Sequence, residues 1–224
     1  MKRVLFLVVA GACLAAPATA DMVQFYQLPY DNVDSTTGFG AGTNVLAVSQ
    51  LSLLAGDAMA YAMRNGSAGV FTQRDTRGLG IQGGELDEVD KDLVGIVEHI
   101  DVVFTEAYYI DSVELRSLFK PDPSPAAGEI AVVSVIREYG TSSQVTETSW
   151  QLLGFEDIAW GTDGAVTQSL GGIVLNAGDA LVFSPEAGEF ALAAMTVRLV
   201  PVPGAVLLGL LGLGYAGMRL RRSA

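Results

Sequence analysis

Two consecutive segments of the chain, 96–104 and 107–119, alternate apolar and polar side chains with a period of two residues. In the first segment, Ile100, Val102 and Phe104 occupy every second position. This period is typical of strands with one buried face, because successive side chains of a strand point to opposite sides of its sheet. We therefore expect two strands here, joined by a two-residue connection and paired as antiparallel neighbours.

The rest of the central region repeats this pattern of strands and turns. Apolar and β-branched stretches are separated by turn signals rich in Gly, Pro and Asp roughly every 8–12 residues, and helical periodicity is scarce. The pattern predicts an all-β fold, an antiparallel β-sandwich of jelly-roll-like type. Further strands are expected at 22–30, 44–54, 68–72, 129–139, 144–153, 173–175, 180–183 and 189–199.

The N-terminus has the three parts of a secretory signal peptide. Two basic residues and an apolar run precede the small residues Ala18 and Ala20. We expect a signal peptide over residues 1–20, cleaved before Asp21. The alternative is lipoprotein processing before Cys13.

The C-terminus combines a proline motif, an apolar run and an arginine cluster. The run 204–218 holds 15 uncharged residues, and as a helix it would cover about 22 Å of a hydrocarbon layer of about 30 Å. Extended to 200–220, the segment would just span, so we expect a transmembrane helix with its arginines on the cytoplasmic side. The residues that define this signal, within 201–224, are Pro201, Val202, Pro203, Gly204, Arg219, Arg221 and Arg222.

An export signal at one end and this tripartite tail at the other resemble the PEP-CTERM class of bacterial surface proteins. The resemblance covers about a tenth of the chain, and the family's Pro-Glu-Pro is Pro201-Val202-Pro203 here, without the glutamate. It implies a variant sorting signal that is recognised and removed by an exosortase-type membrane transpeptidase. The alternative is a plain membrane anchor. A second stretch, 78–119, is similar to a Gly- and acid-rich segment of secreted β-sandwich domains that have such tails.

The two terminal signals leave residues 21–200 as a single exported domain, a length suited to one core. This domain holds all 25 acidic residues and eight of the basic ones, a formal net charge of −17. Such a surface repels nucleic acid, so no nucleic-acid partner is expected. Cys13 is the only cysteine, and cleavage would leave the domain without a thiol or a disulfide.

An acidic loop follows the Gly-rich stretch and is the candidate metal site. Carboxylates and backbone carbonyls are the ligands that Ca²⁺ prefers, and glycines let carbonyls converge. The spacing is not that of an EF-hand, so the alternative is a solvated acidic loop without metal. No other cofactor is indicated, and the candidate Ca²⁺ ligands are Glu85, Asp87, Glu88, Asp90 and Asp92.

The sequence offers little that points to catalysis. His99 is the only histidine, and no nucleophile elbow accompanies it, so a Ser-His-Asp triad and a zinc site are not indicated. Glycoside hydrolysis needs only two carboxylates. Among 25 acidic residues some pair will always lie at a workable distance, so this signal is not specific. Aromatic side chains that could stack on sugars are Tyr108, Tyr109, Trp150 and Trp160, although core positions are the more usual role of such residues.

We therefore expect an exported, non-enzymatic protein of the cell surface or extracellular matrix, membrane-anchored through its C-terminus before sorting, with a structural or adhesive role. The first alternative is a Ca²⁺-dependent glycan-binding module with extracellular polysaccharide as partner. The second alternative is a secreted glycoside-active enzyme.

If the acidic loop binds Ca²⁺, chelation with EDTA will lower the melting temperature, because a ligand that binds only the folded state stabilises it. The double substitution Asp87→Asn with Asp90→Asn will abolish the difference between Ca²⁺ and EDTA. Thermal melting with and without Ca²⁺ measures both effects. A wild-type curve insensitive to EDTA would leave the loop as solvated acid.

Overall fold

The computed structural model of the protein describes eight stretches of the chain. Residues 20–199 form one compact unit. The described stretches are residues 20–25, 43–46, 48–74, 77–83, 88–91, 95–119, 128–154 and 164–201.

The described residues form β-strands and one short 3₁₀ turn, Leu54–Gly56. The all-β class expected from the alternation is therefore confirmed. The strands are β1 Asp21–Gln24, β2 Thr43–Val45, β3 Gln50–Leu53, β4 Ala58–Arg64, β5 Ser67–Ala68, β6 Phe71–Arg74, β7 Gly78–Ile81, β8 Val89–Lys91, β9 Glu98–Phe104, β10 Tyr108–Arg116, β11 Ile130–Arg137, β12 Val145–Leu153, β13 Val166–Leu175 and β14 Ala180–Leu199.

One strand, β14, organises two sheets. Its first part, 180–187, pairs with β11 on one edge and β9 on the other, and the sheet continues through β12 beyond β11 and through β4 and β3 beyond β9. We call this the β11 sheet. Its second part, 191–199, pairs with β10, and β13 pairs with the other edge of β10. β1 also pairs with this part of β14, and so does β7, from which the sheet continues through β6 to β2. We call this the β10 sheet.

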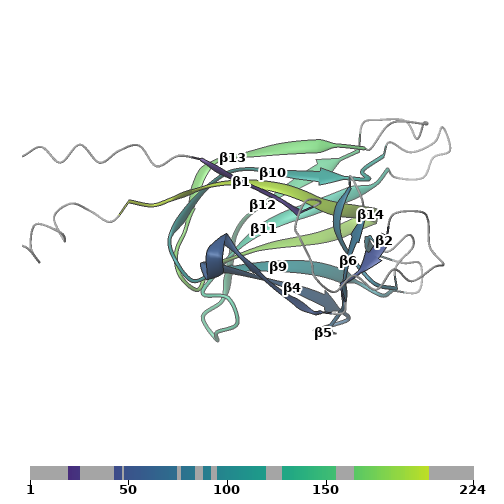
Figure 1. The fold of residues 1–224 in the computed structure, drawn as a ribbon, viewed down its shortest axis with the longest axis horizontal. Helices are drawn as coiled ribbons and strands as arrows, with labels where there is room; N and C mark the ends of the chain where they lie inside the picture. Colours follow the sequence, from purple (N-terminus) through teal and green to yellow (C-terminus); the bar gives the residue numbers. More distant parts are fainter. Residues whose placement is uncertain are drawn as a thin grey trace, which may run out of the picture. The chain divides into compact units, whose positions relative to one another are not determined.

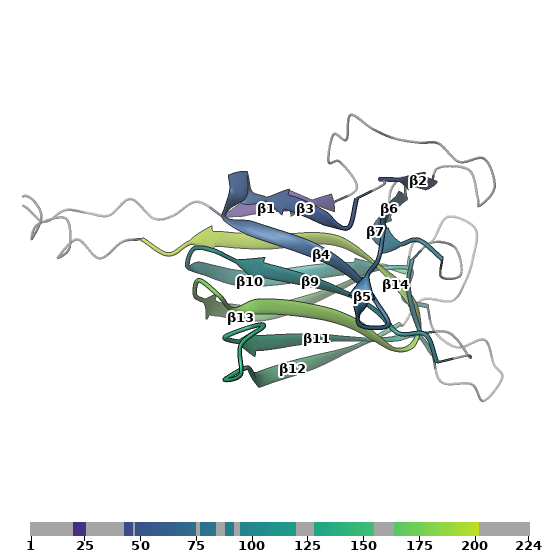
Figure 2. The ribbon, with the colours of Figure 1, turned by 90° about the horizontal axis from the view of Figure 1, so that it is seen from below.

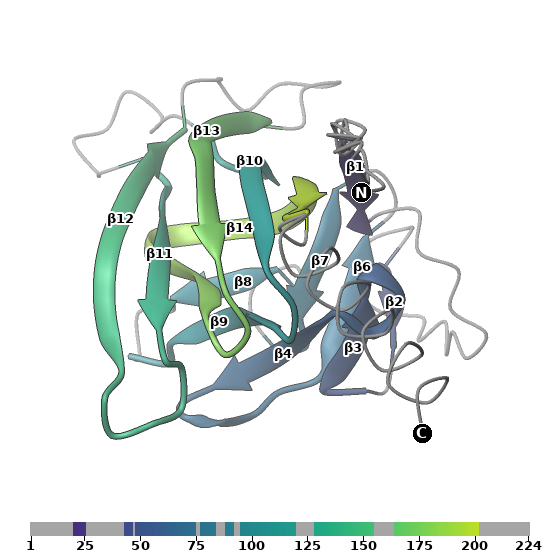
Figure 3. The same ribbon diagram turned by 90° about the vertical axis from the view of Figure 1, so that its left-hand side faces the viewer.

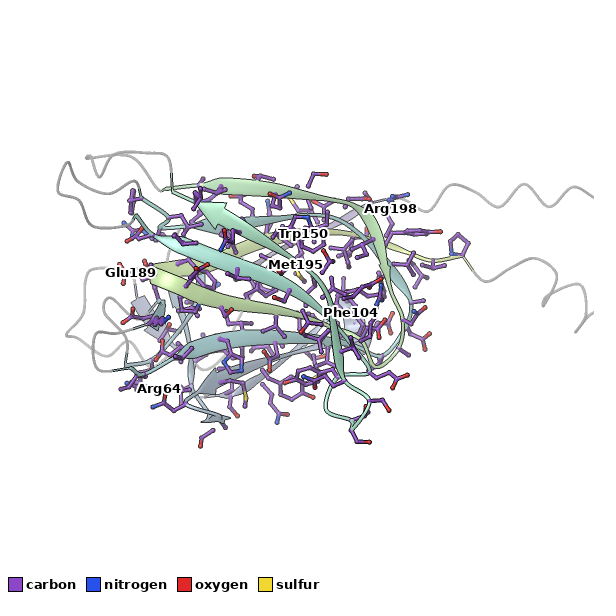
Figure 4. The ribbon with its side chains drawn as sticks, turned by 180° about the vertical axis from the view of Figure 1, so that it is seen from behind. Arg64, Phe104, Trp150, Glu189, Met195 and Arg198 are labelled. Atoms are coloured by element: carbon purple, nitrogen blue, oxygen red, sulfur yellow. The ribbon has the colours of Figure 1, made fainter. Side chains whose placement is uncertain are left out.

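All these pairings are antiparallel, and the strands wrap around a common interior to form a nearly closed, sandwich-like sheet (Figure 3). The core lies inside it and contains Phe104, Phe183, Phe190 and Met195, each fully buried. Figure 4 shows the labelled side chains of Phe104, Trp150 and Met195 among the strands. The antiparallel sandwich expected from the sequence is thus observed at the level of architecture.

The sequence predicts two strands, 180–183 and 189–199, where the structure has the single strand β14. Pro185 and Gly188 interrupt the apolar pattern and indicated a turn, but the chain continues as one strand. The pairing with β11 shifts register beside Pro185, and Gly188 has a φ of 70°. Proline and a positive φ are both tolerated where a ladder is irregular, so these residues bend the strand instead of ending it. The bend carries β14 from the β11 sheet to the β10 sheet.

The expected hairpin between 96–104 and 107–119 is wrong, although both strands exist as β9 and β10. Both edges of β9 are occupied by β4 and β14, and both edges of β10 by β13 and β14. The connection after Phe104 therefore crosses from the β11 sheet to the β10 sheet. Tight hairpins favour Gly or Asn in their turns, and Thr105 and Glu106 are neither.

The strand register gives the domain two distinct ends. At the terminal end, Tyr108 lies opposite Leu175 and Leu199, and Asp21 lies opposite Val197. The start of β1 and the end of β14 accordingly share one side of the domain (Figures 1 and 2). At the distal end, Arg116 lies opposite Ala191, and Glu98 lies opposite Arg64. Figure 4 shows Arg64 and Glu189 at the side opposite Arg198.

Among the residues that the structure describes, no helix has the length and apolar character needed to cross a bilayer. The predicted membrane segment 204–218 and the predicted signal peptide up to residue 19 lie outside the described residues.

Gly188→Ala should destabilise the domain more than Gly171→Ala. Both glycines have a positive φ, 70° and 69°, so both variants bear the same backbone strain. A Cβ at Gly188 would lie 2.5 Å from Glu129 Cγ, whereas a Cβ at Gly171 would meet nothing within 4 Å. We expect the difference in the free energy of unfolding to be about 1–3 kcal/mol, measured by urea denaturation. Equal losses would mean that the close approach at the bend of β14 has no energetic role.

Candidate functional site

The distal end contains a cluster of buried charges that includes part of the predicted acidic loop. Glu88, just before β8, is fully buried, and Asp90 is 8% exposed. The other candidate ligands, Glu85, Asp87 and Asp92, lie outside the described residues. The two acids that the structure describes therefore face the interior, contrary to a fully solvated loop.

Arg77 neutralises Glu88 inside the cluster. Its Nη1 donates to Glu88 Oε1 and to Ser117 Oγ, both at 2.9 Å, and Ser117 Oγ donates to the same carboxylate oxygen at 2.8 Å. The guanidinium also lies over the ring of Phe119, 6.0 Å from its centroid. Because a buried carboxylate is costly without a partner, this network fixes the chain before β7 to the ends of β8 and β10.

Arg64 forms a similar ion pair with Glu98 on the neighbouring strands β4 and β9. Its Nε lies 3.3 Å from Glu98 Oε1, and its two Nη atoms donate to the backbone carbonyls of Gln82 and Gly83 at 3.1 and 3.0 Å. Glu98 is fully buried, and its second oxygen accepts the backbone N–H of Asp90 at 3.1 Å. The pair joins β4, β8 and β9 to the turn that follows β7.

Glu129 adds a second carboxyl group to the Arg77 cluster. Its side chain accepts the backbone N–H of Phe119, and its own N–H donates to the Phe119 carbonyl at 3.2 Å. Burial raises the pKa of this carboxyl to about 7; the Phe119 N–H and Arg77 oppose the shift, and the charge of Glu88 adds to it. Glu129 is thus a group near Glu88 and Arg77 that changes charge close to neutral pH.

The carboxylates of the cluster are arranged for ion pairs with arginine more than for metal binding. Glu88 and Glu98 direct carboxylate oxygens at arginine side chains, and an arginine within hydrogen-bond distance repels a cation. No group of three or more His, Cys, Asp or Glu side chains suited to a metal ion occurs in the described part of the chain. The Ca²⁺ expectation for the loop now depends on Glu85, Asp87 and Asp92, outside that part.

His99 lies on the outward face of β9, apart from the buried network. Its Nε2 is 3.6 Å from Asp101 Oδ2, which also accepts a hydrogen bond from the Tyr139 hydroxyl. Burial raises the pKa of Asp101, while Tyr139 and His99 oppose that shift. The arrangement holds Tyr139, from the turn after β11, against β9.

The aromatic side chains considered for sugar stacking do not form one platform. Trp150 packs against the core, and Tyr108 is 6% exposed with its hydroxyl donating to Asp57 Oδ2 at 2.8 Å. Tyr109 lies beneath the guanidinium of Arg198, 5.1 Å from ring centroid to Cζ. Trp160 lies outside the described residues.

The terminal signals are described only at their inner borders. Ala20, Asp21 and Pro201 are exposed. The other predicted signal residues lie outside the described residues: Ala18, Val202, Pro203, Gly204, Arg219, Arg221 and Arg222.

Sequence reasoning missed the arginines and Glu98, although one signal was present. Glu98 shares the parity of Ile100, Val102 and Phe104 on β9. A carboxylate on the buried face of a strand needs a charged or hydrogen-bonding partner, so its position alone could have indicated a buried ion pair. The identity of that partner, Arg64, depends on the pairing of β4 with β9.

A scan against protein-family models gives no match to this chain, and a search of curated proteins gives none either.

Glu129→Gln should make the stability of the domain less dependent on pH. In the wild type the raised pKa means that the folded state binds more protons than the unfolded chain between about pH 4.5 and 7, so the free energy of unfolding falls as pH rises through this window. Glutamine cannot ionise but keeps an oxygen for the Phe119 N–H. Urea denaturation at several pH values measures the slopes, with exposed Glu106→Gln as the control. Parallel wild-type and Glu129→Gln curves would contradict the assignment.

Proposed function

We propose that this protein is an exported component of the cell surface or extracellular matrix, with a structural or adhesive role. Its domain, a jelly-roll-like sandwich, would be freed from a signal peptide at Asp21 and sorted through its C-terminal signal. A membrane-embedded transpeptidase of the exosortase type would recognise that signal and act near Pro201 to Gly204.

The observation that carries this proposal is the fit between the folded unit and the two predicted signals. The first strand starts at Asp21, immediately after the predicted cleavage site, and Ala20 is exposed. The last strand ends at Leu199, two residues before Pro201. Removal of both signals would therefore cost the domain none of the strands that the structure describes.

The position of the two ends supports a role in contacts away from the attachment point. Asp21 and Leu199 both lie at the terminal end, so the distal end is the part of the domain farthest along the strands from either signal. The Arg64–Glu98 and Arg77–Glu88 pairs hold that end together. A distal end held by these ion pairs, away from a single attachment point, suits a matrix or adhesive protein.

The test compares the native tail with a generic Leu-rich helix of about 20 residues that keeps Arg219, Arg221 and Arg222. With the native tail we expect a product that starts at Asp21 and ends near Pro201 to Gly204, read by intact-mass analysis of the surface fraction. Pro201→Ala with Pro203→Ala should block the C-terminal shortening and leave membrane insertion intact.

Two outcomes would count against the proposal. Identical delivery and identical mature mass for both tails would make the tail a plain anchor. A lipid-modified start at Cys13 would replace the predicted cleavage at Asp21.

A further inference from the structure

The hairpin that joins β4 to β5 contains the one Asn-x-Ser/Thr triplet of the sequence, Asn65-Gly66-Ser67. The residue two positions after each of the other asparagines, Asn32, Asn44 and Asn176, is Asp, Leu and Gly in turn. An asparagine followed at this spacing by serine or threonine, with no proline between them, is the acceptor motif for a glycan on the amide nitrogen. The triplet is a modification site if its amide is accessible in the folded domain.

The turn accounts for two residues of the triplet and leaves the third unexplained. Asn65 and Gly66 both have a positive φ, 50° and 72°. A two-residue hairpin of type I′ needs a positive φ at both central positions, and asparagine followed by glycine is its favoured sequence. Ser67 is the exposed first residue of β5, and the turn does not require a serine there. This serine is the residue that completes the acceptor motif.

The side chain of Asn65 is held through its oxygen and not through its nitrogen. Its Oδ1 accepts the backbone N–H of Val97 at 3.0 Å, and its backbone N–H donates to the Val97 carbonyl at 3.0 Å. Within the described part of the chain, neither the Asn65 Nδ2 nor the Ser67 hydroxyl makes a hydrogen bond. A glycan replaces one hydrogen of the amide nitrogen and leaves the amide oxygen as an acceptor, so it is compatible with the contact that anchors the turn.

The turn has room for a large substituent. Residues 65–68 are exposed, and a Cβ at Gly66 would meet nothing within 4 Å. Among the described strands, β5 pairs with β4 alone and at two positions, so the hairpin tip can open to an enzyme without loss of the sheet. Arg64, the preceding residue, lies at the distal end (Figure 4).

We propose that Asn65 is the attachment site of an N-linked glycan at the distal end of the domain. The inference rests on the proposed function, because a membrane-bound oligosaccharyltransferase acts on chains that have crossed the membrane. The donor is an oligosaccharide on a polyprenyl diphosphate. The Asn65 Nδ2 forms a bond to the anomeric carbon, and the bond from that carbon to the diphosphate oxygen breaks. The diphosphate leaves with the electron pair, and the amide proton goes to a base of the transferase.

The place of the glycan fits a protein of the matrix or cell surface. The terminal end is taken by the predicted attachment, since Asp21 and Leu199 both lie there. A glycan on the β4–β5 turn adds an uncharged, hydrated group at the opposite end, in a domain with a net charge of −17 from 25 acidic and eight basic residues. The distal end would then present a sugar to its surroundings.

The test is peptide mapping by mass spectrometry of the full chain, expressed in its own cells and taken from the surface fraction. Cleavage after Arg64 and Arg74 releases residues 65–74, which should carry whole sugar residues on Asn65. Ser67→Ala should abolish the modification, and Ser67→Thr should retain it, since either hydroxyl completes the motif. Asn65→Asp keeps an acceptor oxygen for the turn but has no amide nitrogen, so it should also lose the sugar.

Asn176 is the internal control, because it is exposed but lacks the motif and should carry no sugar. Melting curves establish that the variants are folded, and either Ser67→Ala or Asn65→Asp suffices. A chain that starts at Asp21 with Asn65 unmodified, or only deamidated, would overturn this inference and leave the proposed function standing. An unmodified chain that retains residues 1–20 would overturn both. Sugar that survives Ser67→Ala would also overturn the inference, because its attachment would not use the motif.

Discussion

The fold depends on one strand that belongs to both sheets. β14 is paired along its two edges, with β9 and β11 in its first part and with β1 and β10 in its second. The long strands β9, β10 and β11 pair with β14 directly, and β4, β13 and β12 join the sheets through these three. Phe183, Leu192 and Met195 project from it into the core and are fully buried. The bend at Pro185 and Gly188 is therefore the point where one sheet becomes two.

Buried carboxylates at the distal end are paired with arginines, in a domain that has many acids and few bases. Two of the eight basic residues between 21 and 200, Arg64 and Arg77, each contact a buried carboxylate at this end. A buried pair adds little to stability compared with an apolar packing of the same shape, but loss of one partner is costly because a charge then remains buried. These pairs accordingly specify which strands meet at the distal end. Glu129, with a pKa raised to about 7, makes that end sensitive to pH.

The sequence predicted local structure better than it predicted which strands meet. Alternation around Ile100 and Val113 identified β9 and β10, because the alternation of apolar and polar residues along a half-buried strand is visible in the sequence itself. It could not identify their partners, because pairing depends on strands far away in sequence, and the short connection suggested a hairpin that does not form. Pro185 misled for a related reason: its effect depends on the ladder around it, and beside a register shift it bends the strand.

The candidate site was predicted only in part. Acidic spacing drew attention to Glu88 and Asp90, but the burial of Glu88 and the arginine that neutralises it emerge only when β7, β8 and β10 come together. The orientation of the side chains of β4 was harder still to predict. Met59, Tyr61 and Met63 alternate with alanines, so the sequence pattern cannot tell which set faces the core; in the structure the alanines do.

The position of β14 also determines how the domain would bear mechanical load. A pull on Leu199 is directed along a strand held on both sides, by β10 opposite Leu199 and by β1 opposite Val197. Antiparallel ladder bonds run perpendicular to the strands, so such a pull loads many of them in shear at once. A pull on Asp21 instead acts on β1, whose four residues pair with β14 alone. We therefore expect the domain to resist a pull at its C-terminal end better than a pull at its N-terminal end.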